Sequence, residues 1–231
     1  MCGRYTLTQS AKAISEYFGI PDIPNFKPQY NIAPTQLVLA VLHGSDSDLN
    51  VDNSVCNKRI LQQLRWGLIP PWAKDKSMGA KLINARSETV AEKPSFRAAF
   101  KRRRCLLVTD GFYEWQRQDG KQQPFYFRLQ NQQLFAFAGL WEQWQSPEGE
   151  QIKSCTILTA IANEMIQPIH ERMPVILQPE DYDLWLDVQV PDLKMLKPLL
   201  QPLSAESMTA YPVSALVNNV RNNHPECIMP V

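Results

Sequence analysis

The chain has 231 residues, a net charge of +1, and a composition that is 44% hydrophobic and 10% aromatic. This composition is typical of a packed globular protein and excludes intrinsic disorder, while the near-zero charge requires any nucleic-acid surface to be local. No apolar run approaches the roughly 20 residues of a membrane helix, and no secretory leader is recognisable. The five cysteines form no CxxC pair, so we expect neither a metal site nor a disulfide framework, and a reducing cytoplasm as the location.

Turn-forming residues divide the first half of the chain into short elements. The first helix is predicted between Thr8 and Phe18, with Thr8 or Ser10 as its N-cap and Gly19 as its stop. Ser87 resembles a further helix cap. A proline-rich loop is predicted over 20–34, strands over 37–43, 59–69 and 81–86, a polar excursion over 44–58, and a second helical segment over 95–103.

The second half of the chain alternates strands with turn signals at hairpin spacing. Its strongest apolar segment is 104–116, and Asp119-Gly120 is a tight hairpin signal. Further strands are predicted over 124–129, 134–144, 153–162, 175–178 and 208–216, a helical turn over 163–169, and helices over 179–187 and 192–200. With no repeat and no linker, we expect one α+β domain over 1–231, an antiparallel sheet curled toward a distorted barrel and flanked by short helices.

The chain begins Met1-Cys2-Gly3-Arg4. If Met1 is removed, Cys2 carries a free amine and a thiol two carbons apart. The amine has an ordinary pKa of about 7.7–8, and cations such as Arg4 can lower the pKa of the thiol below about 8.5. The amine can form a Schiff base with an aldehyde, and the thiolate can then close a thiazolidine ring. The alternative is that Cys2 is an ordinary small apolar residue behind a retained Met1.

Three further side chains are candidates for chemistry. His170 lies in a loop and can exchange a proton near neutral pH; otherwise it is a structural histidine. Glu114 interrupts an apolar strand, where a buried carboxylate needs a partner such as an amine; otherwise it faces solvent. Asn84 can donate and accept at once and so orient an amine or a hydroxyl; otherwise it is an ordinary amide at the end of a strand.

Cations and tryptophans add features that suit DNA. Arg4, Arg86 and Arg172 each lie two residues from a candidate site residue and together can bind phosphate. The run 101–104 is also basic, which is more typical of a solvated helix face. Two tryptophans flank a proline-containing loop and can stack on bases, although packing in the core for Trp66 and exposure for Trp72 are the alternatives.

Taken together, these segments resemble the SRAP family, the SOS-response-associated peptidases that process abasic DNA. The motifs follow the family order over nearly the whole chain. They are Met1-Cys2-Gly3-Arg4, Tyr30-Asn31-Ile32-Ala33-Pro34, Trp66-Gly67-Leu68-Ile69-Pro70, Ile83-Asn84-Ala85-Arg86-Ser87-Glu88-Thr89, Asp110-Gly111-Phe112-Tyr113-Glu114-Trp115, Ile169-His170-Glu171-Arg172-Met173-Pro174 and Val217-Asn218-Asn219-Val220.

The resemblance implies a distorted antiparallel barrel, autoproteolytic removal of Met1, and a Cys2 thiazolidine crosslink to the aldehyde of an abasic site in single-stranded DNA. It implies supporting roles for Asn84 and Glu114 and acid–base work for His170. It implies abasic single strands as the partner, including sites at junctions with duplex. We expect no cofactor, and we expect a monomer because one compact domain with an N-terminal site needs no partner subunit. The expected DNA contacts are Arg4, Asn31, Pro34, Trp66, Trp72, Arg86 and Arg172.

The sequence also departs from the family pattern and leaves rival functions open. Ala73 stands where bacterial members often have a second tryptophan, so the expected wedge against duplex is smaller, and no arginine contact is assigned over 90–95. One rival is an N-terminal-nucleophile glutamine amidohydrolase, which glutaminase activity would identify. Another is a non-covalent reader of modified bases, whose binding would survive loss of Cys2. A third is a peptidase acting on other proteins.

Overall fold

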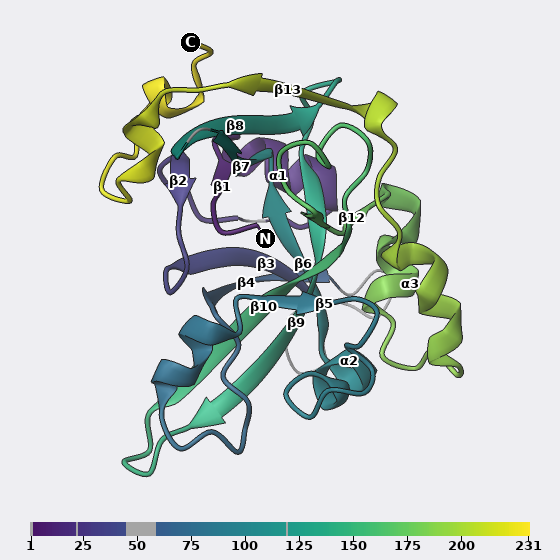
Figure 1. Cartoon of the computed structure of the whole chain (residues 1–231). Helices are drawn as coiled ribbons and strands as arrows, with labels where there is room; N and C mark the ends of the chain where they lie inside the picture. The colour runs from purple at the N-terminus through teal and green to yellow at the C-terminus, as the bar shows by residue number, and fades with distance from the viewer. Residues whose placement is uncertain (1, 22, 45–58, 119) are drawn as a thin grey trace.

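The structure is a computed structural model, and it describes residues 2–21, 23–44, 59–118 and 120–231 (Figure 1). Five strands of the lower half form a closed ring. Pairings of β3 with β4, β4 with β10, β10 with β9, β9 with β6, and β6 with β3 return to the starting strand. These strands are β3 (Leu37–His43), β4 (Arg59–Trp66), β6 (Arg104–Thr109), β9 (Phe135–Gln145) and β10 (Gln151–Ile161).

The barrel contains both parallel and antiparallel strand pairs, whereas the sequence predicted an antiparallel sheet. Strand β10 runs parallel to β4 and to the short β5 (Asn84–Arg86), and antiparallel to β9. Hairpin spacing predicts pairing only between neighbours in the sequence, and these two parallel pairs join strands that are distant in the chain. Two short strands extend the barrel sheet, β11 (Arg172–Pro174) on β10 and β12 (Ile176–Leu177) on β9.

A second, antiparallel sheet lies above the barrel in Figure 1, in the order β13-β8-β7-β1-β2. Aromatic rings pack between the two sheets, with Tyr5 edge-on to Trp66 and to Phe137. Residues of both sheets belong to one continuous buried cluster. The strands of this sheet are β1 (Tyr5–Leu7), β2 (Gln29–Ile32), β7 (Gly111–Gln118), β8 (Lys121–Leu129) and β13 (Met208–Pro212).

Short helices flank the sheets. The first, α1 (Ala11–Phe18), is capped by the Ser10 side chain, which accepts a hydrogen bond from Ala13 N, and it ends at Gly19 in the left-handed conformation. The other helical elements are α2 (Arg97–Arg102), α3 (Tyr182–Leu186) and the 3₁₀-helices Lys76–Lys81, Pro179–Asp181, Leu193–Leu200, Ala205–Ser207, Ala215–Asn218 and Pro225–Ile228. Among the described residues, no helix is long and apolar enough to cross a membrane.

Several expected boundaries differ from the structure. Ser87 caps no helix, because turns occupy 87–96 before α2 begins. The segment 104–116 forms two strands that separate at Asp110. This buried carboxylate accepts hydrogen bonds from the Thr6 and Thr8 hydroxyls and from the backbone of Thr8 and Gln9. Asp110 thereby ties β1, and the two residues after it, to the β6–β7 corner. Of the predicted excursion over 44–58, residues 45–58 lie outside the described residues, as does Asp119 of the predicted hairpin.

Candidate functional site

Cys2 lies fully buried at the start of β1, where two sheets and the short β5 meet. The Asn84 Nδ2 donates a hydrogen bond to the Cys2 carbonyl oxygen over 2.8 Å. Parallel pairing of Asn84 with Ile157 of β10 fixes the position of this amide. The Asn84 Oδ1 is buried and accepts no hydrogen bond from the described residues, so the amide retains an acceptor beside Cys2.

Glu114 is buried, with 3% of its surface exposed, and its alternative as a solvent-facing residue is wrong. Strand β7 is buried on both faces: Phe112 belongs to the core between the sheets, while Tyr113 packs under the C-terminal segment. Alternation along the strand puts Glu114 on the side of Phe112. Burial raises the pKa of Glu114 to about 7, against the opposing charge of the amino terminus.

The Cys2 thiol does not have the lowered pKa expected from its cationic neighbour. Burial, and secondarily the Glu114 carboxylate, raise the pKa of this thiol well above its ordinary value. Arg4 affects the thiol only through its backbone, since Cys2 Sγ lies 3.8 Å from the Arg4 carbonyl oxygen. The thiol is therefore neutral near pH 7. Because the Glu114 carboxylate contributes to this raised pKa, we assign the two groups to one site.

His170 follows the turn over 163–169 and is half-buried. Its Nδ1 lies 3.0 Å from the backbone nitrogen of Arg172 and 3.1 Å from the carbonyl oxygen of the same residue. The unprotonated Nδ1 can accept from that N–H, and the protonated Nδ1 can donate to that carbonyl. Burial, followed by the charge of the amino terminus, lowers the pKa of His170. The ring therefore has a backbone partner in either protonation state at Nδ1.

Arg4 and Asn31 form one network with the C-terminal loop 217–222. The Arg4 Nη1 donates to Asn31 Oδ1 and to the Val217 carbonyl, each over 2.7 Å, and its guanidinium lies over the Trp115 ring. The Asn31 amide donates to three carbonyl oxygens of the loop and is only 2% exposed. These contacts commit the Asn31 side chain to the loop in this structure.

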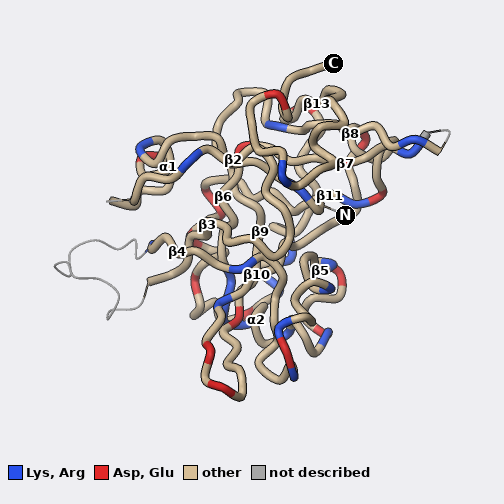
Figure 2. The backbone as a smooth tube through the Cα atoms, turned by 90° about the vertical axis from the view of Figure 1, so that its left-hand side faces the viewer, with Lys and Arg blue, Asp and Glu red and all other residues tan. Residues whose placement is uncertain are grey.

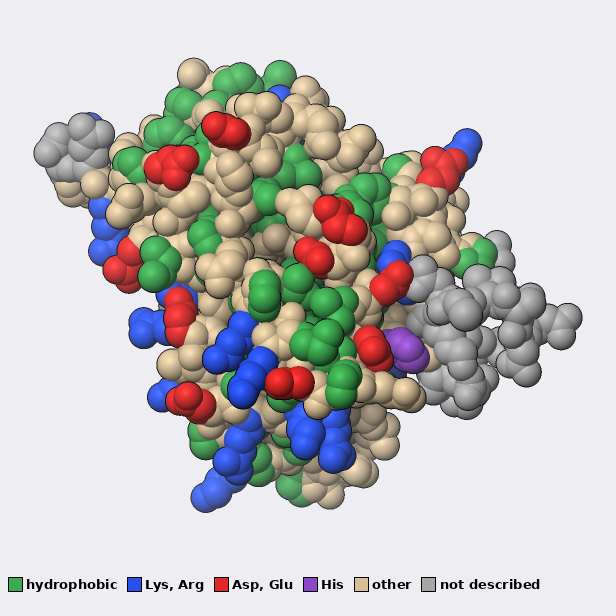
Figure 3. Space-filling model, turned by 90° about the vertical axis from the view of Figure 1, so that its right-hand side faces the viewer, with side chains coloured by type: hydrophobic (Ala, Val, Ile, Leu, Met, Phe, Trp, Pro, Cys, Tyr) green, Lys and Arg blue, Asp and Glu red, His purple; other side chains and the backbone are tan. Residues whose placement is uncertain are grey.

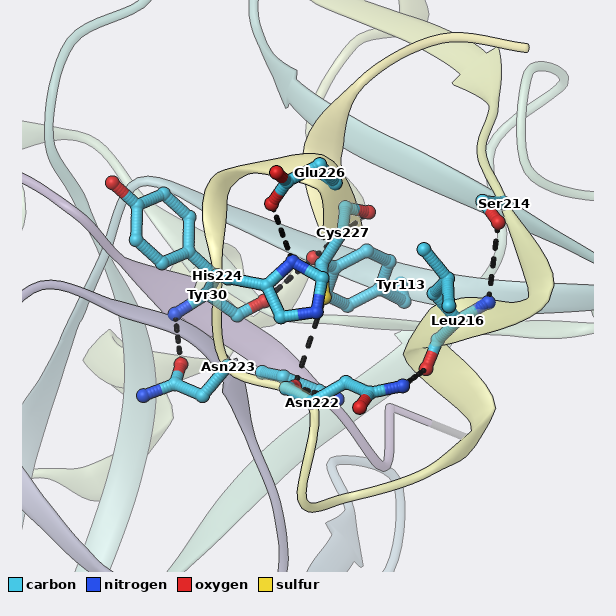
Figure 4. A network of polar contacts seen from close by, with 10 residues as sticks. Tyr30, Tyr113, Ser214, Leu216, Asn222, Asn223, His224, Glu226 and Cys227 are labelled. Atoms are coloured by element: carbon cyan, nitrogen blue, oxygen red, sulfur yellow. Dashed lines mark hydrogen bonds and ion pairs between the residues drawn. The ribbon is translucent and has the colours of Figure 1, made fainter.

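The C-terminal segment is held against β2 and β7, as Figure 4 shows. The Tyr113 hydroxyl donates to the Tyr30 carbonyl, and the Tyr30 N–H donates to Asn223 Oδ1, each over 2.6 Å. His224 Nδ1 contacts the Glu226 carboxylate over 2.5 Å. This packing closes the outer side of β7 and keeps Glu114 on the inner side.

Arg172 and Arg86 differ in how much of their charge is available. The Arg172 guanidinium binds both carboxylate oxygens of Glu88, over 2.6 and 2.9 Å, and also contacts Thr159. This pairing lowers the pKa of Glu88. Arg86 is exposed at the end of β5 and has no ion pair with any residue that the structure describes.

The two tryptophans have opposite environments. Trp66 is fully buried, and its Nε1 donates to the Ile83 carbonyl, so it presents no ring face to a base in this structure. Trp72 is 58% exposed in a turn closed by a hydrogen bond from Ala73 N to the Pro70 carbonyl. Ala73 is itself buried under Trp144, which donates to its carbonyl. Pro34 is half-buried in the turn after β2.

Comparison with protein-family profiles matches residues 1–220 to the family described as SOS response associated peptidase (SRAP). The chain belongs to the SRAP family. It is 47% identical over 232 residues to abasic site processing protein YoqW of Bacillus subtilis, covering 99% of each chain. It is 36% identical over 234 residues to abasic site processing protein HMCES of Xenopus tropicalis, covering 91% of this chain and 68% of that one.

Solved structures share the fold of this SRAP chain. A crystal structure of a protein from Bacteroides thetaiotaomicron superimposes with a TM-score of 0.85 at 24% identity and covers both chains completely. A second, from Bordetella bronchiseptica, superimposes with a TM-score of 0.73 at 25% identity and covers 92% of this chain. These likenesses agree with the expected α+β fold, a barrel with short helices.

Two acidic residues that organise this SRAP site were not among the sequence-based candidates. Asp110 ties the chain after Cys2 to the β6–β7 corner. The feature of the sequence that could have indicated it is a single carboxylate between two apolar strands. Glu88 holds the Arg172 guanidinium, and its signal was an acid two residues after the exposed Arg86. Neither long-range contact follows from the spacing of residues in the sequence.

Proposed function

We propose that this protein captures abasic sites in single-stranded DNA as a covalent thiazolidine on Cys2, after it has removed its own Met1. The observation that carries the proposal is the meeting of three groups: the buried Cys2, the Asn84 amide on its carbonyl, and the buried carboxyl of Glu114 with a pKa of about 7. The names of the relatives, abasic site processing proteins, give the substrate class.

The raised thiol pKa supports an order of events in which the amine reacts first. The Cys2 amine adds to the sugar aldehyde and forms an imine with loss of one water. The neutral thiol then adds across the imine, forming a carbon–sulfur bond while its proton passes to the nitrogen. Glu114 can carry protons in both steps because its pKa lies near the working pH. Ring closure removes the imine, and with it the route to strand cleavage.

His170 and Asn84 have roles that suit their contacts. An abasic sugar is mostly a closed hemiacetal, and His170 can transfer protons to open it, since its Nδ1 keeps a backbone partner whether protonated or not. The buried Asn84 Oδ1 can accept a hydrogen bond from the Cys2 amine or from a sugar hydroxyl. We assign Asn84 to positioning and His170 to acid–base chemistry.

The DNA would lie across the exposed groups around this pocket. Arg86 and Trp72 are exposed and can bind phosphate and stack on a base. Arg4 and Arg172 would meet DNA through the part of each guanidinium not used in the protein, while Pro34 would line the path. A monomer suffices, because every group named here comes from one chain, and a junction with duplex is a compatible substrate.

The decisive experiment is a denaturing gel of the protein with single-stranded DNA that carries one abasic site, after intact mass has shown whether Met1 is gone. We expect a heat-stable shifted band that is absent with undamaged DNA and absent with Cys2→Ala. Cys227→Ala is the matched control, because it removes another buried thiol and should keep the band. Cys2→Ser and Cys2→Ala both keep the main-chain amine, so either variant, once intact mass shows that Met1 is gone, should give a band only when borohydride reduces the imine.

The same assay separates the alternatives. No band from protein proven to start at Cys2 would contradict the proposal. Glutaminase activity that Cys2→Ala abolishes would then identify an amidohydrolase, and DNA binding that survives Cys2→Ala would identify a base reader. The His170 assignment is contradicted if His170→Ala crosslinks and reverses at the rates of the unchanged protein.

A further inference from the structure

The positive charge of this chain is concentrated in one segment. Residues 92–104 contain six Lys or Arg and one Glu, a net charge of +5, so the rest of a chain of net charge +1 carries −4. This segment comprises α2, the turns before it and Arg104 at the start of β6, and it begins six residues after Arg86, the last residue of β5. Figure 2 shows Lys and Arg segments around α2, below β5, and Figure 3, which views the opposite side of the molecule, shows Lys and Arg gathered in the lower half of its own face.

The structure sorts these cations into structural and available ones. Arg104 is buried and donates to the backbone carbonyls of Trp185, Phe100, Lys101 and Asp187. Arg103 pairs with Glu142 over 2.7 Å. The cations Lys93, Arg97, Lys101 and Arg102 are exposed, and none of them has an ion pair within the described part of the chain. Arg103 and Arg104, half of the basic run 101–104, therefore have structural partners. Lys101 and Arg102 are exposed, and the exposed cations continue through Arg97 and Lys93 toward β5.

The available cations form a file that starts at Arg86, two residues after Asn84. Backbone hydrogen bonds link Thr89 N to Arg86 O, Lys93 N to Thr89 O, and Arg97 N to Lys93 O. Lys93, Arg97 and Lys101 follow at four-residue spacing. Arg97 and Lys101 are one turn apart in α2, about 6 Å along the helix, and Lys93 lies one hydrogen-bonded turn before Arg97. We call Arg86, Lys93, Arg97 and Lys101 the basic file.

The basic file carries an electrostatic cost for the fold. Like charges four residues apart destabilise a helix, and a cation in the first turn faces the positive end of the helix dipole. Arg97 has both features, and α2 has no acidic residue in its first turn and no side-chain cap. An anionic partner removes this repulsion, and phosphates spaced along a strand match a file of cations.

We propose that the basic file binds the phosphates of the DNA arm on one side of the abasic site, extending the contact from Arg86 along α2. This inference rests on the proposed function, because the file begins at the Asn84 strand of the crosslinking site. We choose single-stranded DNA over an acidic protein as the partner, because the basic file begins on β5, the strand that carries Asn84 of the proposed crosslinking site. The contact is with the backbone and so is independent of base sequence.

The test uses DNA with a tetrahydrofuran abasic analogue, which has no aldehyde and reports binding without chemistry. Two oligonucleotides place a long arm either 5′ or 3′ of the analogue. We expect the unchanged protein to bind one of them about fivefold more tightly, and the triple variant Lys93→Ala, Arg97→Ala, Lys101→Ala to lose this preference. The slope of log affinity against log salt should fall in magnitude by about 2, from three lost phosphate contacts on a single strand.

A charge-matched control and an opposite variant make the test specific. Lys12→Ala, Lys194→Ala, Lys197→Ala also removes three exposed cations, from α1 and the 3₁₀-helix Leu193–Leu200, and should keep the arm preference and the salt slope. Glu92→Gln removes the one acid of the segment and should increase affinity for the preferred arm about twofold. Melting temperatures of all variants report whether they are folded.

The outcomes separate this inference from the proposed function. With a true abasic site at saturating DNA, the triple variant should still form the covalent band, because Cys2, Asn84 and Glu114 are unchanged. An unchanged arm preference and salt slope in the triple variant, or equal losses in the control, would overturn the inference while leaving the crosslink intact. Absence of the covalent band from the unchanged protein would instead contradict the proposed function.

Discussion

The proposed reaction site at Cys2 and the basic file lie next to each other and differ in burial, in charge and in exposure to solvent. Cys2 and Glu114 are buried, and burial is the largest cause of both of their pKa shifts. Arg86 and Arg97 are exposed, where solvent and salt screen their charges. Buried groups should therefore control the rate and its pH dependence, while exposed groups should control affinity and its salt dependence.

The largest expected effect is on the rate of crosslinking, from a substitution of the buried Glu114. Glu114→Gln should slow crosslinking about 100-fold, because proton transfer by a placed group contributes at least that much. In the unchanged protein the rate should rise with pH through about 7, as the Glu114 carboxyl ionises. Single-turnover crosslinking measured against pH should show this rise, and the variant should keep only the later rise from the Cys2 amine, whose ordinary pKa is about 7.7–8. The same pH profile in both proteins would contradict a proton-carrying role for Glu114.

The same substitution should stabilise the fold at alkaline pH. Burial raises the pKa of Glu114 from 4.5 to about 7, so between these values the folded state holds a proton that the unfolded state has released. The free energy of unfolding therefore falls as pH rises through this window, by about 3 kcal/mol in total. Denaturant unfolding at pH 4 and pH 8 should show this fall for the unchanged protein and its loss in Glu114→Gln.

Asn84→Ala should have the next largest effect, about tenfold on the crosslinking rate. It removes the hydrogen bond to the Cys2 carbonyl and so lets Cys2, the proposed nucleophile, shift from its reactive geometry. Affinity for the tetrahydrofuran analogue should change less than the rate, because the residue acts on positioning. Asn84→Asp keeps an acceptor but loses the donor, and a recovery of rate in that variant would contradict the donor role.

Trp66, at the end of β4, and Trp72, in the loop that follows, compare a buried tryptophan with an exposed one. Trp72→Ala should lower affinity for single-stranded DNA about tenfold, as expected for one stacked base, with little change in melting temperature. Trp66→Ala should instead destabilise the fold by about 3 kcal/mol or more, as for a large core side chain. Affinity and melting temperature measured on both variants check this, and equal losses of affinity in two folded proteins would contradict it.

The smallest effect concerns a single exposed charge. Arg86→Ala should weaken binding a few-fold at low salt and reduce the magnitude of the salt slope by about 0.7, the value for one phosphate contact on a single strand. The covalent yield at saturating DNA should not change. Titrations at several salt concentrations give the slope, and a slope equal to that of the unchanged protein would place Arg86 away from the DNA.

Local sequence patterns predicted where strands and helices lie better than they predicted which strands pair with each other. The aliphatic run 37–43 matches β3 at both ends, and the burial of Glu114 followed from its place between aromatic residues. The parallel pairing of β10 with β4 and β5 joins distant segments, and no hairpin signal reports it. The thiol pKa of Cys2 was predicted in the wrong direction because a nearby cation is visible in the sequence, whereas enclosure by two sheets is not.

Pairing of distant strands also sets when the site is complete during synthesis of the chain. Cys2 is among the first residues to leave the ribosome, while Asn84 needs β10 as its neighbour and His170 comes later still. At about 5–20 residues per second, roughly 10–30 seconds of translation separate Cys2 from His170. Under the proposed function the chain removes its own Met1, so the Cys2 nitrogen stays in an amide bond and cannot react with aldehydes of the cell until the barrel closes and the site is complete.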